Sequence, residues 1–464
     1  MIKHLLTYSF ILISFLTFAQ TEVTINDIFI TGNKKTRDRV ILRELTFRKG
    51  QKLDKETLNA EIEQSQKNIL NTNLFVKAEV NSKDQNDGNE VDVSIEVVEN
   101  WYLFPYPIFE LADRNFNVWW QEQGRSLGRV NYGLRVQYLN PTGNADKLKL
   151  TIQDGYTKKY ELDYFVPGIN KAQTLGFFAN VFFSRRREIA FITDENKLLF
   201  DAFDEQFQLR RFRIGGGISY RPGLYVYHTA KVIYSDNSIS DRIAFDLNPE
   251  YFLNNKNNQK QFTLQYIGTI DKRDIKPFPL NGYLLSLDAK KEGIGISKDV
   301  NSLTAKFKYA QYISFNKRMS LESIMILKTN FLRHKQPYTH LNSLGYGEDT
   351  MNGYELYVID GMDFGILKTS FRYELFEKNW KLGKIMPIKR MREMPMKAYI
   401  ALNNDIGYLN SPNYEHYGFL ANQALWGGGI GLNLVMYYDK VFLIEYSLNQ
   451  LGEKGVFLDF SLTF

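Results

Sequence analysis

The back four-fifths of the chain repeats one pattern, a short run in which every second residue is apolar. In DKLKLTIQ (146–153), Leu148, Leu150 and Ile152 share one face, and the opposite face carries lysine, threonine and glutamine. A period of two predicts β-strands with one apolar and one polar face. Soluble β-sandwiches share this period, so alternation alone leaves the fold class open.

Three further features favour a membrane barrel with a polar lumen. The apolar faces are long and aromatic-rich, the opposite faces carry full charges, and the chain has an export signal without cysteine or a lipid-anchor signal. The 34 Phe, 29 Tyr and 5 Trp residues suit the aromatic girdles of such a barrel. Beyond the leader, no run approaches the roughly 20 apolar residues of a spanning helix. Residues 101–464 are therefore predicted to form an all-β transmembrane barrel, because only a closed barrel satisfies strand backbones in lipid.

We expect about sixteen antiparallel strands, an even number as in other bacterial barrels. The predicted ranges are 103–110, 130–140, 146–154, 158–166, 174–184, 205–221, 224–235, 260–271, 281–291, 301–314, 317–331, 361–376, 396–406, 425–438, 441–449 and 455–464. Successive strands cross the membrane in alternating directions. If the amino-terminal domain lies in the periplasm, counting the strands places the connection 332–360 outside the cell and the stretch 271–282 in the periplasm.

The first 100 residues divide into a leader and a small domain. Residues 1–19 combine a basic start with an apolar run and a small residue at the end, which predicts a secretory signal peptide. Residues 21–100 read β-α-α-β-β, the order of a small α+β domain with one sheet and two helices. Thr36 is expected to cap the first helix and Asp54 the second.

Composition and motifs argue against several function classes. The absence of cysteine removes disulfides, thiolate metal sites and cysteine nucleophiles. A net charge of +6 is small for 464 residues and argues against nucleic acid as a partner. The five histidines lack metal-ligand spacing, no GxSxG elbow is present, and the glycine runs 215–217 and 427–429 lie inside strand patterns. We therefore expect no enzyme, and no catalytic, cofactor-binding or metal site.

A charged, rigid segment, DKRDIKPFPLNG, precedes one predicted strand. Its prolines and glycine favour a tight turn, and its charged residues can satisfy exposed backbone groups and one another. The turn residues are Asp271, Arg273, Asp274, Pro277, Pro279 and Gly282.

These features together resemble the superfamily of BamA, TamA and FhaC, the Omp85 proteins of the Gram-negative outer membrane. Residues 21–100 are similar to a POTRA domain in element order and in the turn GNKKT. The charged turn 271–282 resembles the turn that precedes a barrel strand in this family, and YLNPTGNAD (138–146) resembles an early barrel hairpin. The terminal Phe464 resembles the family's carboxy-terminal assembly signal.

The resemblance also implies a loop motif, Arg-Gly-Phe/Tyr, that folds into the lumen and is held by acidic residues of the barrel wall. The matching segment reads GEDTMNGYELYVIDG, in which Gly353 and Tyr354 agree but Asn352 replaces the arginine. The expected wall residues are Asp405 and the neighbouring Gly407. Because a charged hydrogen bond is roughly twice as strong as a neutral one, the loop is either held more loosely or anchored by another residue. The alternative is that NGY is an ordinary turn of a surface loop.

A pair of prolines marks a candidate seam. Pro105 and Pro107 stand two apart in WYLFPYPIFEL, so both remove backbone donors from the same strand edge. If this edge lies toward the closing strand 455–464, which ends at Phe464, closure is weaker and lateral opening costs less free energy. The alternative is that 101–110 is only a linker between the two domains.

The resemblance implies a protein that inserts outer-membrane proteins or moves polypeptides across the outer membrane. The POTRA domain would capture clients by strand addition, and the barrel seam would open laterally. A two-partner-type secretion transporter and a passive pore or structural barrel are the alternatives. Expected partners are unfolded outer-membrane or secreted polypeptides, outer-membrane lipids, and periplasmic chaperones or accessory subunits, but no nucleic acid. The basic segment 378–392 would contact anionic head groups, a soluble partner or only solvent.

Overall fold

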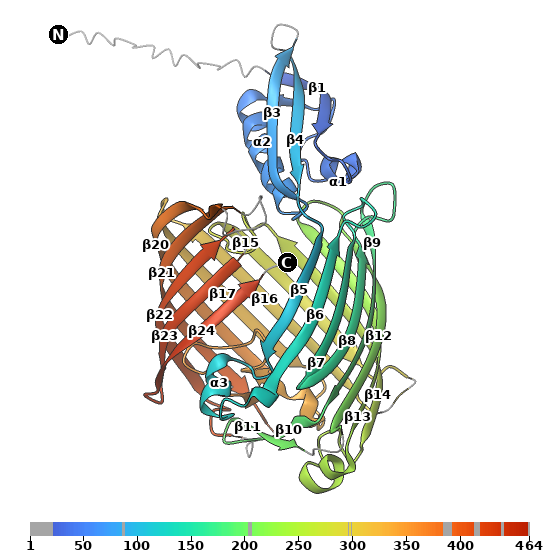
Figure 1. Cartoon of the computed structure of the whole chain (residues 1–464), viewed down its shortest axis with the longest axis vertical. Helices are drawn as coiled ribbons and strands as arrows, with labels where there is room; N and C mark the ends of the chain where they lie inside the picture. Colours follow the sequence, from blue (N-terminus) through green and yellow to red (C-terminus); the bar gives the residue numbers. More distant parts are fainter. Residues whose placement is uncertain are drawn as a thin grey trace, which may run out of the picture.

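One antiparallel sheet of sixteen strands dominates the computed structural model of the protein. Figure 1 shows this sheet rolled into a barrel with a small amino-terminal domain at one end. We call this end of the barrel the near end and the opposite end the far end. The structure describes residues 22–85, 89–202, 207–295, 297, 299–383, 392–412, 418–437 and 440–462. The predicted signal peptide lies outside the described residues.

Each barrel strand pairs with its neighbour along the chain, from β5 at one edge of the sheet to β24 at the other. The strands are β5 (Leu103–Leu111), β6 (Val130–Leu139), β7 (Lys147–Gly155), β8 (Thr157–Val166), β9 (Leu175–Arg186), β12 (Leu209–Tyr220), β13 (Val226–Ile239), β14 (Asn258–Asp271), β15 (Gly282–Glu292), β16 (Ser302–Ser314), β17 (Met319–Asn330), β20 (Asp363–Lys381), β21 (Glu393–Asn410), β22 (Ala424–Met436), β23 (Lys440–Asn449) and β24 (Lys454–Leu462).

Smaller elements lie in the connections of the far end. They are the helix α3 (Phe116–Gln121), the short helices η2 (Leu127–Arg129), η3 (Arg242–Leu247) and η4 (Tyr338–His340), the hairpin β10 (Glu188–Asp194) and β11 (Lys197–Ala202), and the pair β18 (Asn342–Leu344) and β19 (Ile359–Asp360).

The barrel is apolar outside and polar inside. In β7, Leu150 and Ile152 are 40% and 48% exposed, whereas Thr151 and Gln153 between and beside them are buried. Water-soluble sheets bury the apolar face instead. Exposed apolar side chains on alternate strand positions are what a barrel needs when lipid surrounds it.

The predicted fold class is confirmed, and the sixteen predicted strands correspond in order to the sixteen strands of the sheet. Strands β20 and β21 extend beyond the predicted 361–376 and 396–406, and the predicted strand 205–221 begins only at Leu209. Residues Leu103–Leu111 pair with β6, so the alternative that 101–110 is only a linker is wrong. Within the described residues, no helix combines the length and apolarity of a membrane-spanning helix.

The amino-terminal domain has the predicted order with one strand added. Its elements are β1 (Glu22–Thr31), α1 (Asp38–Leu42), β2 (Lys52–Asp54), α2 (Lys55–Leu70), β3 (Phe75–Gln85) and β4 (Glu90–Glu99). The sheet order is β2-β1-β4-β3, and β1 runs parallel to β4. Alternate strand residues such as Ile25 and Ile95 pack with helix residues such as Leu58 and Ile69 into a buried core. Asp54 caps α2 as predicted, because its side chain accepts a hydrogen bond from the Thr57 N–H at 2.8 Å.

The prediction for Thr36 is wrong, because the residue before α1 is Arg37 and makes no side-chain cap. The Thr36 hydroxyl instead lies 2.7 Å from the Tyr102 hydroxyl and accepts a hydrogen bond from the Asn140 amide at 2.9 Å. Asn140 belongs to the near-end turn between β6 and β7. Thr36, which the sequence predicts as a helix cap, therefore joins the amino-terminal domain to the barrel.

The two motifs GNKKT and YLNPTGNAD lie against each other. The Arg37 N–H donates to the Gly143 carbonyl at 3.0 Å, and the Lys35 ammonium donates to the Tyr138 hydroxyl at 2.7 Å. A Cβ at Gly143 would lie 2.5 Å from the Lys35 carbonyl oxygen, so this close approach requires glycine. The carboxylate of Glu99 holds the first motif by accepting from the backbone N–H groups of Lys35 and Thr36.

An ion pair adds a second attachment between the domain and the barrel. Glu44 accepts two hydrogen bonds from Arg221, at 2.6 and 2.8 Å, in the turn between β12 and β13. Both side chains are largely buried, at 9% and 15% exposed. A third contact runs from the Asn71 amide, at the end of α2, to the Asp274 carbonyl in the turn between β14 and β15. The domain therefore rests on several near-end turns from the first half of the barrel.

We expect Arg221→Gln to loosen this attachment, because it leaves the Glu44 carboxylate buried without its cation. The expected cost to docking is about 2 kcal/mol, the contribution of hydrogen bonds to a charged group, which is roughly a 30-fold change in equilibrium. Hydrogen–deuterium exchange of residues 37–45 in the intact protein measures it as faster exchange. Lys49→Gln is the matched control, because its pair with Asp27 is exposed and should contribute little. Equal exchange in the Arg221 variant and the wild type would contradict the prediction.

Candidate functional site

The connection 331–362 between β17 and β20 folds back into the lumen and packs on the barrel wall. Its residues Met351, Tyr354 and Tyr357 belong to one buried cluster with Ile366 of β20 and Leu409 of β21. We call this connection the lumen loop. It contains the predicted motif Asn352, Gly353 and Tyr354, so the motif is not part of an exposed surface turn.

The structure brings Asn352 to Asp405, the predicted wall residue, through the loop backbone. The Asn352 N–H donates to the Asp405 carboxylate at 2.9 Å, and the wall residue is 1% exposed. Lys368, opposite Asp405 in the β20–β21 register, lies 3.8 Å from the same carboxylate and donates to the Thr350 carbonyl at 3.1 Å. A cation thus reaches this carboxylate from the wall and not from the loop.

Glycines allow the lumen loop to lie directly on the wall. Gly353 has a φ of +81°, and a Cβ there would lie 2.6 Å from the Leu448 carbonyl oxygen. A Cβ at Gly407 would lie 2.5 Å from the Met351 sulfur, and one at Gly427 only 1.8 Å from the Asn352 carbonyl oxygen. Real Cβ atoms do not approach backbone oxygens this closely, so the packing of the loop on the wall depends on Gly353 and Gly427. At Gly407 the nearest atom belongs to a flexible methionine side chain, which could move away.

Hydrogen bonds from the first far-end loop, residues 112–129, hold the other side of the lumen loop. Arg114 donates to the carbonyls of Gly345, Leu356 and Tyr357 at 2.8–3.1 Å. The Asn115 amide donates to the Glu355 carbonyl at 2.7 Å. Charged donors make the stronger hydrogen bonds, so Arg114 is a main anchor of the lumen loop.

The charged turn between β14 and β15 spans residues 272–281 and is longer than the predicted tight turn. Asp271 pairs with Arg273 at 2.8 Å, as expected, and the Asp274 carboxylate accepts from the Leu280 N–H at 3.1 Å. The turn contains Pro277 and Pro279 and ends at Gly282, which has a φ of +96°.

This turn also reaches across the near mouth of the barrel. Phe278, between the two prolines, packs on Tyr399 of β21 with ring centroids 4.9 Å apart, and Val435 of β22 belongs to the same cluster. Arg372 of β20 lies over the Phe278 ring and pairs with Glu322 at 2.6 Å. The segment that the sequence predicts as a simple turn therefore fills part of the lumen.

The seam between β5 and β24 carries both predicted prolines. Among the described residues these strands are the two edges of the sixteen-stranded sheet. The Leu139 N–H donates to the Tyr102 carbonyl and the Ala112 N–H to the Arg129 carbonyl, so even-numbered residues of β5 face β6 in this register. Pro105 and Pro107 are odd-numbered and face the free edge. Phe464 lies outside the described residues.

Helix α3 bridges the far end of this seam. The helix follows β5, and the Asn117 amide donates to the Val456 carbonyl of β24 at 2.8 Å. Figure 1 shows α3 beside the far end of β24. Asn115, which bonds the lumen loop, also caps α3 by accepting from the Val118 N–H. One short segment thus contacts both the lumen loop and the edge of the seam.

Sequence reasoning missed Arg114, Asn117 and Lys368. The segment DRNFNVWWQ does carry a helix-cap signal, an asparagine before an apolar run, which could have indicated α3. Nothing in the sequence indicates that Lys368 faces Asp405, since this follows from strand register. Residues 384–391 of the predicted basic segment lie outside the described residues. Within the described part of the chain, no three metal-ligating side chains cluster.

Two family models match the chain. A POTRA model, described as a surface antigen variable number repeat, matches residues 23–100, and the Omp85 superfamily domain matches residues 140–364. Together they cover about two thirds of the sequence. The second match includes the charged turn and the lumen loop motif but ends before Asp405. No curated protein matches the chain.

Several solved structures share the fold, among them those of BamA and CdiB proteins. The crystal structure of BamA from Haemophilus ducreyi lacking POTRA domains 1–3 matches with a TM-score of 0.53 and 12% identity, over 95% of this chain and 85% of that one. CdiB from Escherichia coli matches with a TM-score of 0.55 and 12% identity, over 95% of this chain and 76% of that one. At this identity the likeness concerns the arrangement of the elements.

Gly427→Ala is expected to displace the lumen loop, because its methyl group would overlap the Asn352 carbonyl. The expected cost is about 1–3 kcal/mol, as for other overpacked sites. Exchange of residues 349–358 should become faster while the barrel strands remain protected. Gly223→Ala is the matched control, because no atom lies within 4 Å of its added methyl group. An unchanged loop in the Gly427 variant would show that the loop does not depend on this contact.

The lumen loop should also be held less firmly at alkaline pH. Burial raises the pKa of Glu355 from 4.5 to about 7, and its Oε2 has no hydrogen-bond partner. The docked loop therefore binds the proton more tightly than the free loop, so this stabilisation is complete below about pH 4.5 and is lost as the pH rises through 7. Exchange protection of residues 349–358, corrected for intrinsic rates, should fall between pH 6 and pH 8. Glu355→Gln should abolish that fall, and a fall of equal size in this variant would refute the assignment.

Proposed function

Because the chain belongs to the Omp85 superfamily, we propose that it inserts outer-membrane proteins into the membrane through the seam between β5 and β24. The barrel lies in the bacterial outer membrane and the POTRA domain in the periplasm, so the near end is periplasmic and the far end faces outward. Members of the family are insertases and polypeptide transporters. Which of these activities this chain has is the subject of the proposal.

The observation that carries the proposal is the proline-interrupted edge of β5. Five residues of β5, the odd-numbered ones, point their backbone toward the free edge, and two of them are prolines without an N–H. Each net hydrogen bond contributes about 1 kcal/mol, so closure against β24 is weaker by about 2 kcal/mol than for a strand without prolines. A client strand could displace so weakly paired an edge at low cost.

The POTRA sheet offers a second pairing edge. The sheet order leaves β2, with three residues, and β3, with eleven, at its edges. Of these two edge strands, β3 is long enough to receive an extended client segment by backbone pairing, which tolerates many sequences. Unfolded outer-membrane polypeptides are the clients we infer, and chaperones or accessory subunits that deliver them would be further partners.

The contents of the lumen favour insertion over passive conduction. The charged turn lies across the near mouth through Phe278, and the lumen loop packs on the wall through Tyr354. A passive pore requires a continuous aqueous path, and a secretion transporter would have to displace both segments. Lateral insertion leaves both in place. The reaction we propose makes and breaks no covalent bonds, so it requires no catalytic residue or cofactor.

The test replaces both prolines, Pro105→Val and Pro107→Val, in protein reconstituted into liposomes. Two added donors should stabilise closure, so folding of a urea-unfolded eight-stranded barrel added to the liposomes should slow by about tenfold or more. The readout is the gel-mobility shift of the folded client. Leu103→Val, on the same strand, is the control, because it leaves every backbone donor in place. Unchanged client folding in the double variant would remove the role of the seam.

A second measurement distinguishes two outcomes: that the seam does not open, and that the protein does not insert clients at all. Because the chain has no cysteine, Asn117→Cys with Val456→Cys allows α3 to be joined to β24 by a short bismaleimide. The joined protein should lose client folding, whereas either single variant treated alike should keep it. If wild-type protein conducts ions in planar bilayers and never accelerates client folding, the protein is a pore and not an insertase.

A further inference from the structure

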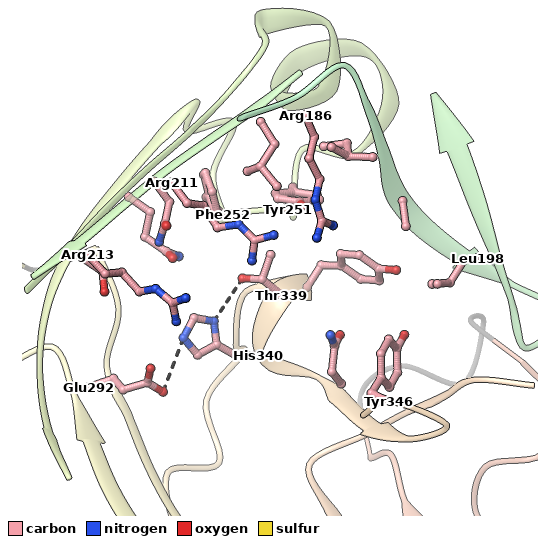
Figure 2. Close-up of a pocket in the computed structure, with 18 of the residues that line it drawn as sticks. Arg186, Leu198, Arg211, Arg213, Tyr251, Phe252, Glu292, Thr339, His340 and Tyr346 are labelled. Atoms are coloured by element: carbon pink, nitrogen blue, oxygen red, sulfur yellow. Dashed lines mark hydrogen bonds and ion pairs between the residues drawn. The ribbon is translucent and has the colours of Figure 1, made fainter. Parts of the chain in front are cut away.

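Three arginines, none of which forms an ion pair with another described residue, line one cavity in the far half of the lumen. The cavity has a volume of about 720 Å³ and is bounded by the barrel wall, the lumen loop and the first far-end loop. Arg186 of β9 and Arg211 and Arg213 of β12 all line it. Figure 2 shows the guanidinium groups of Arg186 and Arg211 directed into the same space, with Arg213 beside His340.

The acidic residues around the cavity already have partners. Asp113 pairs with Arg129 at 2.7 Å, and Glu122 pairs with Lys197 at 3.0 Å. Glu292 lies 3.5 Å from His340, and Figure 2 marks this contact with a dashed line. None of these carboxylates is therefore available to neutralise the three arginines.

Two of the three guanidinium groups have a buried Nε atom without a hydrogen-bond partner among the described residues. The Nε atoms of Arg186 and Arg211 are buried without a hydrogen-bond partner, and no ion pair involves either residue. Arg213 lies 4.1 Å from the centroid of the Phe182 ring and is also attracted by the carboxylates of Glu161 and Asp163. Confining two unpaired cations together costs free energy, because both lose hydration and repel each other. An anion between them would remove that cost.

Strand register adds a neutral donor to the same wall. Arg211 lies opposite Asn237, and Asn237 lies opposite Gln259, in one row across β12, β13 and β14. Neighbouring strands are about 4.8 Å apart, so this row brings Gln259 within reach of a ligand held by Arg211. Gln259 is 2% exposed and lines the cavity, and its Nε2 has no hydrogen-bond partner. A buried amide donor and two buried guanidinium donors face one space.

We propose that this cavity is a binding site for a phosphate group, held by Arg186 and Arg211 with Arg213 and Gln259 beside them. Planar guanidinium forks match the oxygens of phosphate and donate paired hydrogen bonds to it. The phosphate comes either from a free inorganic ion or from the head group of a lipid that enters by the far mouth. This proposal does not depend on client insertion, because none of the four residues proposed to hold the phosphate belongs to the seam between β5 and β24.

The experiment measures phosphate binding by the full-length protein in maltoside detergent. Isothermal titration uses sodium phosphate in one arm and the soluble lipid dihexanoyl phosphatidic acid in the other. Saturable binding of either probe supports the site and identifies the source, and binding of neither overturns it. Arg211→Gln should weaken binding about 10- to 100-fold, the range for a lost charged hydrogen bond.

Matched variants keep the test decisive. Arg210, the residue before Arg211 on β12, is exposed and does not line the cavity. The variant Arg210→Gln should therefore bind phosphate like the wild type. Arg186→Gln gives a second loss-of-binding variant if Arg211→Gln does not fold, as judged by its gel mobility without heating. If a folded Arg211 or Arg186 variant binds phosphate as tightly as the Arg210 variant, the arginines do not form the site.

Discussion

Backbone hydrogen bonding within one sheet is the constraint on which the rest of this structure depends. A strand in lipid must satisfy every N–H and C=O against a neighbouring strand, which fifteen of the sixteen possible interfaces achieve by regular antiparallel pairing. The remaining interface, between β5 and β24, is where this rule is relaxed. Pro105 and Pro107 remove two donors from its edge, and α3 supplies one side-chain donor, Asn117, to the opposite strand. Among the described residues, the interface between β5 and β24 is therefore the part of the barrel wall with the fewest backbone hydrogen bonds.

The parts that lie inside the barrel are linked to this seam. Arg114 and Asn115 hold the lumen loop, and Asn117, two residues further on, contacts β24. Movement of β24 away from β5 would therefore pull on the segment that also holds the lumen loop. On the other side, Asp405 and Lys368 hold the loop on the wall. Short, direct contacts thus join the lumen loop, the segment 114–117 and the edge of the seam.

Asn352 stands where the family resemblance leads us to expect an arginine. A loop arginine would bring its own charge to the Asp405 carboxylate. In this chain the loop offers only a backbone N–H, and the cation comes from Lys368 on the adjacent strand. The carboxylate therefore has a positive neighbour, as a buried charge requires.

The sequence by itself determined the order and faces of the strands, because alternation follows from the local geometry of an extended backbone. Leu150 and Ile152 point outward for this reason, and the count of sixteen follows from counting such runs. Only the tertiary structure decided which distant segments meet. Thr36 reads as a helix cap yet bonds Asn140, and Arg114 bonds Tyr357 more than 200 positions away. Such contacts depend on how a closed wall directs its loops inward, and no local pattern encodes that.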